Sequence, residues 1–193
     1  MNIMNIYERQ ENLNLKIPKN AAIIGCGGIG SWLCINLALI GVENIIIFDP
    51  DRVEYSNLNR TLFRIRDIGK YKTTALKQLI EERRINCNII AINKRYSNEK
   101  LENCLIFDCT DGINVPNAIK LGYDGLNYTI ISNTSNAKVW GGTEQVRYIS
   151  VPSFLGTPQF LANIITNAIV CGVEIRDING KIEEIVKKIM EAK

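Results

Sequence analysis

The amino-acid sequence predicts an α/β fold with a doubly wound, mainly parallel β-sheet and helices on both faces. Three observations support this. Short apolar runs alternate with segments whose apolar residues recur at helical spacing, the first run ends in a cluster of glycines, and an aspartate follows the second run. Strands that are apolar throughout are typical of parallel sheets buried on both faces, and regular strand–helix alternation is typical of doubly wound sheets.

Length and charge favour a single domain that contacts neither nucleic acid nor membrane. The chain has 193 residues, 46% of them hydrophobic, and its 23 basic and 20 acidic residues give a net charge of +3. This length suffices for one well-buried core, so we expect residues 21–193 to form one domain after an N-terminal arm of residues 1–20. Because no basic face, spanning run or signal peptide is evident, we expect a cytoplasmic protein.

The chain has no histidine and six cysteines. Without histidine, any chemistry falls to Asp, Glu, Lys, Arg, Tyr and Cys side chains. No two cysteines form a C-x-x-C pair and most lie in apolar segments, which favours reduced thiols that serve as small core residues. Cys171 lies inside an apolar helical pattern, so we expect it in the core and not as a nucleophile.

The first elements form a β-α-β unit. Residues Ala21–Gly25 are predicted as a buried strand and Asn44–Phe48 as a second one. The helix between them is indicated by apolar residues at helical spacing and a terminating glycine, namely Ile29, Leu33, Leu37, Ile40 and Gly41. A unit of this size is expected for half of a mononucleotide-binding fold.

The alternation resumes after a polar insertion. The stretch Pro50–Asp67 is predicted as a long functional loop, and a helix from Ile68 to about Ile85 follows it. Further strands are predicted at Asn88–Ile92, Leu105–Asp108 and Thr129–Ser132, and further helices at about Asn114–Leu121, Pro158–Val170 and Lys181–Lys193.

A glycine-rich motif, Gly25-Cys26-Gly27-Gly28-Ile29-Gly30, stands between the first strand and the first helix. This position makes the predicted fold Rossmann-like, because Gly25, Gly27, Gly28 and Gly30 let backbone N–H groups approach phosphate oxygens at a helix N-terminus. Asp49, at the end of the second strand, can accept both ribose hydroxyls. The pattern predicts a nucleotide site and leaves FAD, NAD and ATP open. The alternative is a glycine turn that serves only tight packing.

A polar cluster beyond Asp49 favours ATP. Asp51, Asn57 and Arg60 lie in the insertion, and Lys72 follows it. A hydride-transfer enzyme has no use for an arginine and a lysine at this place, whereas an ATP-cleaving enzyme can use them to hold the β- and γ-phosphates and to stabilise departing pyrophosphate. The alternative is that Lys72, in the first turn of a helix, is simply solvated.

The third cluster, Asp108-Cys109-Thr110-Asp111, ends a predicted buried strand. Ligands of open α/β sheets bind at the carboxyl ends of the strands. An acid there with only oxygen ligands suits Mg²⁺ that bridges phosphates, so Asp111 is a candidate magnesium ligand. The alternative is that Asp111 caps the following helix.

These motifs together resemble the ThiF/MoeB family, the bacterial and archaeal relatives of ubiquitin-activating enzyme. The resemblance covers about Tyr7 to Gly172 and rests on four motifs in order: Gly25–Gly30, Ser56-Asn57-Leu58-Asn59-Arg60, Asp67-Ile68-Gly69-Lys70-Tyr71-Lys72 and Asp108–Asp111. It implies that a substrate carboxylate attacks the α-phosphorus of ATP and releases pyrophosphate. An ionised carboxylate needs no general base, so a chain without histidine can perform this reaction.

The resemblance also implies a role for each motif residue. Asp49 would hold the ribose, with Asp51 beside it in the nucleotide site, and Asp111 would hold the magnesium. The phosphates would be held by Asn57, Arg60 and Lys72. The family's N-terminal Tyr-x-Arg-Gln is present as Tyr7-Glu8-Arg9-Gln10. This match implies a homodimer in which Arg9, on an exchanged arm, reaches the γ-phosphate bound by the partner subunit.

The chain departs from the family pattern at several places. Thr61 stands where relatives have glutamine, and the loop before Asp67 is one residue shorter. The zinc-binding C-x-x-C pairs are absent, so no zinc is expected. No cysteine lies between Asp111 and Cys171, where relatives carry a thioester- or persulfide-forming cysteine. The sequence therefore predicts an adenylylating core without covalent transfer.

The substrate prediction follows from what the chain lacks. Relatives that activate ubiquitin-like proteins tend to have a longer crossover loop than the segment Ala137–Pro158. A small-molecule carboxylate is therefore expected, and the chain resembles the compact HcgE-type members, whose substrate is the guanylylpyridinol carboxylate in iron hydrogenase (FeGP) cofactor biosynthesis. Activation of the C-terminal glycine of a ThiS- or MoaD-like protein is the alternative. An NAD-dependent oxidoreductase and a non-catalytic partner subunit are alternatives from other classes.

Overall fold

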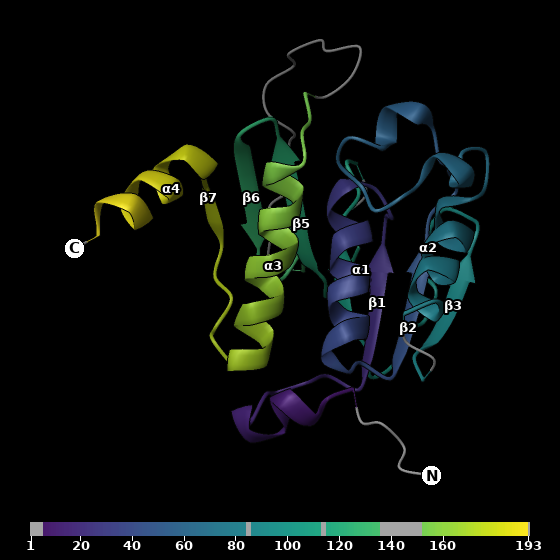
Figure 1. The fold of residues 1–193 in the computed structure, drawn as a ribbon, viewed down its shortest axis with the longest axis horizontal. Helices are drawn as coiled ribbons and strands as arrows, with labels where there is room; N and C mark the ends of the chain where they lie inside the picture. The colour runs from purple at the N-terminus through teal and green to yellow at the C-terminus, as the bar shows by residue number, and fades with distance from the viewer. Residues whose placement is uncertain (1–5, 84–85, 113–114, 136–151, 193) are drawn as a thin grey trace.

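The computed structural model of the chain describes residues 6–83, 86–112, 115–135 and 152–192, and its centre is a seven-stranded sheet (Figure 1). The strand order is β3-β2-β1-β4-β5-β6-β7. The first five strands in this order run parallel, and β6 and β7 are each antiparallel to the preceding strand. The strands are β1 (Asn20–Ile24), β2 (Asn44–Phe48), β3 (Asn88–Ile92), β4 (Leu105–Asp108), β5 (Ile119–Asp124), β6 (Asn127–Ile131) and β7 (Ile178–Lys181).

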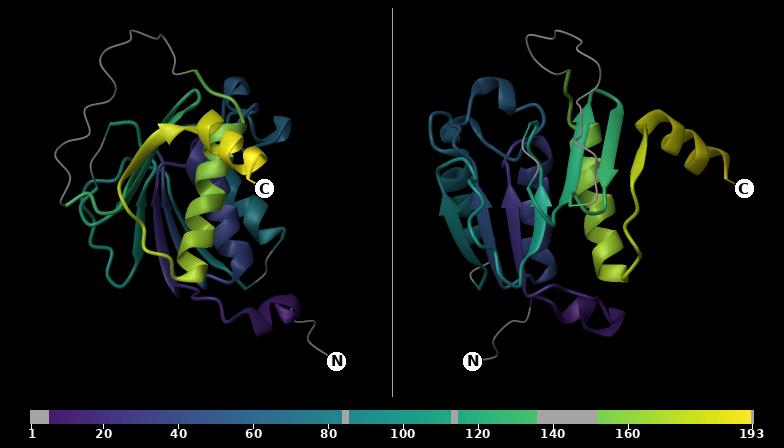
Figure 2. Two further views of the ribbon diagram at one scale, coloured as in Figure 1. Left: turned by 90° about the vertical axis from the view of Figure 1, so that its left-hand side faces the viewer. Right: turned by 180° about the vertical axis from the view of Figure 1, so that it is seen from behind.

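Three helices cover one face of this sheet (Figure 2). They are α1 (Gly28–Ile40), α2 (Lys72–Glu81) and α3 (Gly156–Cys171), and the main core lies between them and the strands. Within the described ranges the other face is covered by non-helical segments. Tyr96, Val115 and Ala118 of these segments form a smaller core with Ile24 of β1 and Phe48 of β2. The Rossmann-like, mainly parallel α/β fold is confirmed, with the described helical layer on one face.

Helix α1 lies directly against the sheet because its second glycine permits a close crossing. A Cβ atom at Gly30 would lie 1.8 Å from the Gly25 carbonyl oxygen, so no larger residue fits there. The helix is apolar nearly all round, with neighbours on both sides in α2 and α3. It ends at Gly41, whose φ of 122° is poorly accessible to other residues.

The helix predicted at Asn114–Leu121 is wrong. Residues from Ile119 onward form β5, which makes a two-residue hairpin with β6 through Gly125, whose φ is 56°. The two loop residues are Gly125 and Leu126, and glycine at the first loop position supplies the positive φ that tight hairpin turns require. The edge strand β7 was not predicted either, because its sequence is polar and short.

The helix predicted from Ile68 begins later, at Lys72, and ends at Glu81. Residues just before it close the insertion: Val53 N–H donates to the Lys70 carbonyl at 2.8 Å and Gly69 N–H to the Val53 carbonyl at 2.9 Å. The insertion also contains two short 3-10 helices, η2 (Tyr55–Asn57) and η3 (Ile65–Asp67). Lys72 therefore stands in the first turn of α2, beside the start of the insertion.

Cys171 is exposed, which contradicts its predicted place in the core. It is the last residue of α3 and is not among the buried residues of that helix, which end with Val170. The other cysteines follow the prediction more closely, since Cys26, Cys34 and Cys87 are buried and Cys104 and Cys109 half-buried. All six are free thiols.

The N-terminal arm lies at the amino ends of the strands, below the sheet in Figure 1. Its 3-10 helix η1 (Glu8–Leu13) is attached to the end of α1, because Gln10 Nε2 donates to the Ile40 carbonyl at 2.8 Å. Further along, Lys16 N–H donates to the Val170 carbonyl of α3 at 2.8 Å. At the other end of the chain, α4 (Ile182–Glu191) projects from the sheet edge after β7 (Figure 1). No helix among the described residues is long and apolar enough to cross a membrane.

Candidate active site

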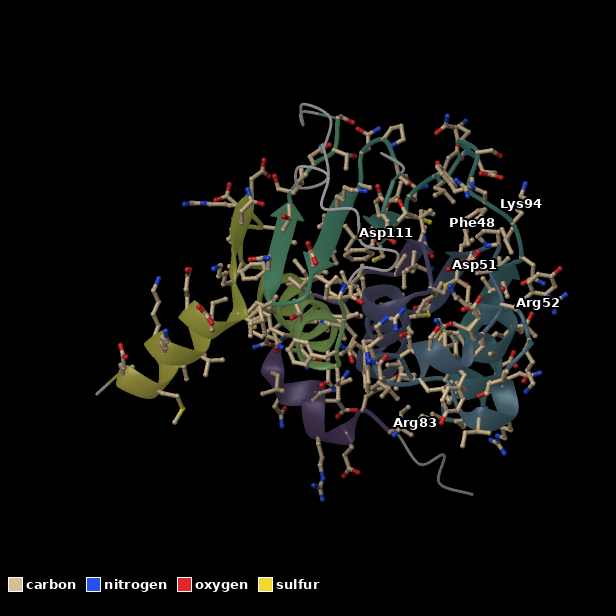
Figure 3. All side chains as sticks on the ribbon, turned by 90° about the horizontal axis from the view of Figure 1, so that it is seen from above. Phe48, Asp51, Arg52, Arg83, Lys94 and Asp111 are labelled. Carbon is tan, nitrogen blue, oxygen red and sulfur yellow. The ribbon has the colours of Figure 1, made fainter. Side chains whose placement is uncertain are left out.

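A cavity of about 320 Å³ opens at the carboxyl ends of β1, β2, β3 and β4. Figure 3 looks down on this end of the sheet, with Asp111 on one side and Phe48, Asp51 and Lys94 on the other. β1 lies between β2 and β4, so β2 and β3 are added on one side of β1 and β4 and β5 on the other. The strand order therefore reverses at β1. This is the place where open α/β sheets bind ligands. The cavity is lined by Ile24, Gly25, Gly27, Phe48, Asp49, Pro50, Asp51, Lys72, Lys94, Arg95, Tyr96, Cys109, Thr110, Asp111 and Gly112.

Asp49 is held at the floor of this cavity. Its Oδ2 accepts the Cys26 N–H of the glycine turn at 2.7 Å, and its Oδ1 accepts the Asp51 N–H at 2.8 Å. Burial raises the pKa of Asp49, while nearby Lys72 and these two N–H donors act in the opposite direction. Because a carboxylate offers about four acceptor positions, each oxygen can still take one hydroxyl group. Asp49 is therefore built to accept a pair of hydroxyls next to the glycine turn.

Lys72 and Asp51 form an ion pair at the cavity wall. Lys72 Nζ lies 2.9 Å from Asp51 Oδ2, and the lysine side chain is only 13% exposed against 64% for the aspartate. The pair is fixed through the backbone as well, since Lys72 N–H donates to the Asp51 carbonyl at 2.9 Å. Beside it, Arg52 stacks 4.0 Å above the Tyr71 ring, which keeps the guanidinium away from the cavity. An ammonium held this way can exchange Asp51 for a phosphate oxygen.

The two acids of the third motif have different environments. Asp108 is fully buried and accepts hydrogen bonds from Thr110, Val115 and Lys120. Asp111 is exposed and lines the cavity. Only Asp111 is therefore accessible to a metal ion. The ranges that the structure describes hold no group of three or more His, Cys, Asp or Glu side chains able to bind a metal.

The four motif glycines divide into two pairs. Gly25 and Gly27 line the cavity, where their backbones can approach a ligand. Gly28 and Gly30 do not: a Cβ atom at Gly28 would lie 2.7 Å from the hydroxyl oxygen of Tyr123, and Gly30 packs on β1. The tight-packing alternative thus holds for the second pair and the nucleotide interpretation suits the first.

Besides Gly28 and Gly30, three further predicted site residues lie outside the cavity lining. Asn57 uses its side-chain oxygen to accept the Glu54 N–H at 3.0 Å, and Arg60 Nη1 donates to the Ser56 carbonyl and to Asn59 Oδ1 within their own loop. Arg9, on η1, is at the opposite end of the strands (Figure 1).

Thr61, the departure from the family pattern, is buried in the same loop. Its hydroxyl donates to the Asn57 carbonyl at 2.9 Å and accepts the Phe63 N–H at 3.4 Å. Thr61 therefore stabilises the loop from inside, and it is not one of the residues that line the cavity.

The segment that follows β3 forms a cavity wall that no sequence motif indicates. Lys94, Arg95 and Tyr96 line the cavity together with Phe48, whose ring makes an edge contact with Tyr96 at 5.3 Å between centroids. Lys94 Nζ pairs with Glu99 at 2.7 Å, which fixes this segment. Aromatic rings in a cavity wall suit contact with a nucleotide base. The position of Lys94, Arg95 and Tyr96 in the sequence could have indicated them, because they follow a predicted parallel strand whose carboxyl end lies at the same edge of the sheet as Asp49.

Two cysteines lie near the site, and neither is suited to nucleophilic attack. Burial raises the pKa of Cys26 and of Cys109, and the neighbouring carboxylates Asp49 and Asp108 raise them further. Because the thiolate is the reactive form, both are poor nucleophiles. The expected crossover segment, Ala137–Pro158, lies mostly outside the described residues, which resume at Pro152.

Comparisons with known proteins show which proteins the chain resembles. The pattern of the ThiF family matches residues 4–121. The chain is 40% identical over 93 residues to the NEDD8-activating enzyme E1 catalytic subunit of Caenorhabditis elegans, covering 48% of this chain and 22% of that protein. It is 31% identical over 132 residues to the sulfur carrier protein ThiS adenylyltransferase of Escherichia coli K12, covering 65% of this chain and 52% of that protein. The chain therefore spans about half or less of these relatives.

The fold also matches solved structures. A crystal structure of E. coli MccB with AMPCPP and MccA superposes with a TM-score of 0.70 and 18% sequence identity, covering 93% of this chain and 72% of that one. At this identity the likeness concerns the fold.

Proposed function

Because the chain belongs to the ThiF family, we propose that it is an ATP-dependent adenylyltransferase that activates a substrate carboxylate as an acyl-adenylate and releases pyrophosphate. The observation that supports this most is the convergence of Asp49, Lys72 and Asp111 on one cavity beside the glycine turn. These are the groups that hydroxyl binding, phosphate binding and metal binding require. They come from three different motifs, and the fold brings them to one edge of the sheet.

Each group has a role in this reaction. Asp49 binds the ribose hydroxyls with the acceptor positions that Cys26 and Asp51 leave unused. The backbone of Gly25 and Gly27 approaches the phosphates, and Lys72 neutralises the charge that develops on departing pyrophosphate. Asn57 and Arg60 reach the phosphates only if the loop that carries them turns, because their side chains now bond within it.

The residues present fit a magnesium ion. Mg²⁺ usually takes one or two carboxylates together with substrate phosphates. The exposed carboxylate of Asp111 at the cavity rim suits that role. When bound, the ion would neutralise phosphate charge during the transfer.

ATP–pyrophosphate exchange tests the proposed function. Purified protein with Mg²⁺ should incorporate labelled pyrophosphate into ATP only when its carboxylate substrate is present. Calorimetry should show ATP binding in the micromolar range typical of nucleotide sites, and NADH should bind far more weakly. Preferential binding of NADH would favour the oxidoreductase interpretation. Intact ATP binding without exchange for any carboxylate would favour a non-catalytic partner subunit.

We further propose a small-molecule carboxylate as the substrate, with the guanylylpyridinol carboxylate of FeGP cofactor biosynthesis as the first compound to test. Support comes from the chain itself, which has no cysteine between Asp111 and Cys171 and only a short span for a crossover segment. The alternative is the C-terminal glycine of a ThiS- or MoaD-like protein, favoured by the similarity to the ThiS adenylyltransferase. Exchange assays with both, followed by hydroxylamine trapping of the adenylate, discriminate between them.

The N-terminal arm suggests a shared site. We propose that residues 21–193 act as one catalytic domain and that the arm of residues 1–20 is exchanged in a homodimer. Within one subunit the helix η1, which carries Arg9, lies at the amino ends of the strands (Figure 1). The cavity lies at their carboxyl ends. An arm with this placement can reach a phosphate site only in another subunit, as a two-fold dimer allows.

A further inference from the structure

Lys120 is a buried charge that the site described so far does not use. It lies on β5, directly beside Asp108 in the parallel pairing of β4 with β5, and is 2% exposed. Its Nζ donates to Asp108 Oδ2 at 2.9 Å and to the Thr110 carbonyl at 3.1 Å. One acceptor ends the strand and the other belongs to the turn after it. The ammonium therefore ties the turn before Asp111 to the strand.

Asp108 has no acceptor capacity left for a metal. Its Oδ1 accepts Thr110 N–H at 3.0 Å and the Thr110 hydroxyl at 2.7 Å, and its Oδ2 accepts Val115 N–H at 3.2 Å besides Lys120. Four donors fill the positions that a carboxylate offers. Asp108 thus organises the turn, and Asp111 remains as the acid that faces the cavity.

The same turn is in contact with the glycine motif. Cys109 N–H donates to the Ile24 carbonyl at 2.8 Å. A Cβ atom at Gly25 would lie 2.8 Å from the Cys109 carbonyl oxygen and 3.3 Å from a Thr110 side-chain carbon. A change in the turn would therefore move Asp111 relative to the first glycine of the phosphate-binding turn.

We infer that Lys120 is a positioning residue for the metal-binding acid. By holding Asp108 and the Thr110 carbonyl together, it fixes Asp111 relative to Gly25, so that a divalent cation can bridge the carboxylate and the nucleotide phosphates. This inference rests on the proposed function. Packing alone does not account for the lysine, because an apolar pair of similar size fills a core at least as well as a buried ion pair. Lys120 adds directed N–H donors, the means by which outer-shell groups orient metal ligands.

Manganese binding tests this inference without relying on catalysis. Mn²⁺ is titrated into protein with α,β-methylene-ATP, and free Mn²⁺ is followed by electron paramagnetic resonance. The Lys120→Met variant should bind Mn²⁺ about tenfold more weakly, as outer-shell changes typically do. Its affinity for the nucleotide without metal should stay within about twofold of wild type, because Asp49 and the glycine backbone are unchanged.

Two further variants keep the test decisive. Lys120→Met leaves Asp108 unpaired and can unfold the chain, so Asp108→Asn/Lys120→Met removes both charges while the amide oxygen still accepts from Thr110. This double variant should fold and still bind Mn²⁺ weakly, because the Thr110 carbonyl has lost Lys120. Lys77→Met is the matched control: Lys77 Nζ also donates to a backbone carbonyl, that of Ile89 at 2.9 Å, but far from the cavity. It should bind Mn²⁺ like wild type.

The outcomes separate this inference from the proposed function. A folded double variant with wild-type Mn²⁺ affinity would overturn the role of Lys120 alone. Wild-type protein that binds no Mn²⁺ with the nucleotide analogue would overturn the proposed metal site at Asp111 and, with it, the inference. Equal weakening of Mn²⁺ binding and metal-free nucleotide binding in the double variant would show a general structural effect and likewise overturn the positioning role.

Discussion

At the scale of single residues, the substitution Asp49→Asn tests the proposed ribose site. Both of its oxygens accept backbone N–H groups, from Cys26 and Asp51. In Asp49→Asn, the new NH₂ group must face one of these donors, which leaves a donor unpaired and removes acceptor positions for the ribose. An unpaired buried polar group costs about 1–3 kcal/mol. We expect ATP affinity, measured by calorimetry, to fall at least about tenfold.

A matched control is available at Asp177. This carboxylate also accepts a backbone N–H, from Ser132 at 2.7 Å, but it is exposed and remote from the cavity. Asp177→Asn should leave ATP affinity unchanged. If Asp49→Asn binds ATP like wild type, the ribose role of Asp49 is wrong.

The second prediction for a single residue concerns the reactivity of the Cys171 thiol. It is the exposed thiol of the six, whereas burial raises the pKa of Cys26, Cys34 and Cys109. Brief treatment with a maleimide should therefore add one label, located at Cys171 by peptide mass spectrometry. Cys171→Ser should block that label and retain full pyrophosphate exchange. A thioester or persulfide trapped on any cysteine would contradict the absence of covalent transfer.

Among the elements, the connection between β2 and α2, which contains the insertion, depends on one buried acid. Asp67 is fully buried between Arg64 Nε at 2.8 Å and Lys70 Nζ at 2.9 Å. Burial alone would raise the pKa of Asp67, but the hydrogen bonds from Arg64 and Lys70 lower it to about 2. In the unfolded chain the pKa is about 3.9. The folded state is therefore stabilised by about 2–3 kcal/mol above pH 4, and this is lost as pH falls through 2.

Urea unfolding between pH 6 and pH 2.5 measures this effect. In Asp67→Asn the free energy of unfolding should be lower at pH 6 and should decline less on acidification, because the titrating group is gone. Glu43→Gln, which removes an exposed pair with Lys19 at 3.7 Å, should leave the profile unchanged. Parallel profiles for wild type and Asp67→Asn would show that Asp67 is not the acid-sensitive group.

Elements differ in how well the sequence specifies them. The predicted bounds of β2, β3 and β4 agree with the structure, because each of these parallel strands is an apolar run bounded by polar residues. β5 was missed, since its second residue is Lys120 and the partner that makes a lysine acceptable there, Asp108, is known only from the fold.

In the candidate site, too, some residues could be predicted from the sequence and others could not. Two of the predicted residues, Asp49 and Asp111, follow predicted strands, and Lys72 begins a helix. The topology of the chain brings all three to one cavity. The side-chain direction of Arg60 depends on contacts within its loop, which periodicity does not report. Lys94 and Arg95 belong to no motif, and only their place after β3 marks them.

At the scale of the whole molecule, the proposed exchange of the arm predicts that a complete site needs two subunits. Arg9 is exposed on η1, and η1 is anchored at the far end of α1 from the cavity. Arg9→Ala should therefore lower pyrophosphate exchange as strongly as a change in the cavity, although it leaves the cavity of its own subunit intact. Asp111→Asn should be nearly inactive for a separate reason, since the metal loses its charged ligand.

Mixing the two inactive variants tests the shared site directly. When subunits re-associate at random, half of the dimers are hybrids, and each hybrid has one site that combines an intact Asp111 with an intact Arg9 from the other subunit. Exchange activity should then return to about a quarter of the wild-type level. A mixture of either variant with itself should stay inactive. If native mass spectrometry shows hybrid dimers and activity still does not return, Arg9 does not act in the partner's site, because the only arrangement that restores a full set of residues would have been formed without effect.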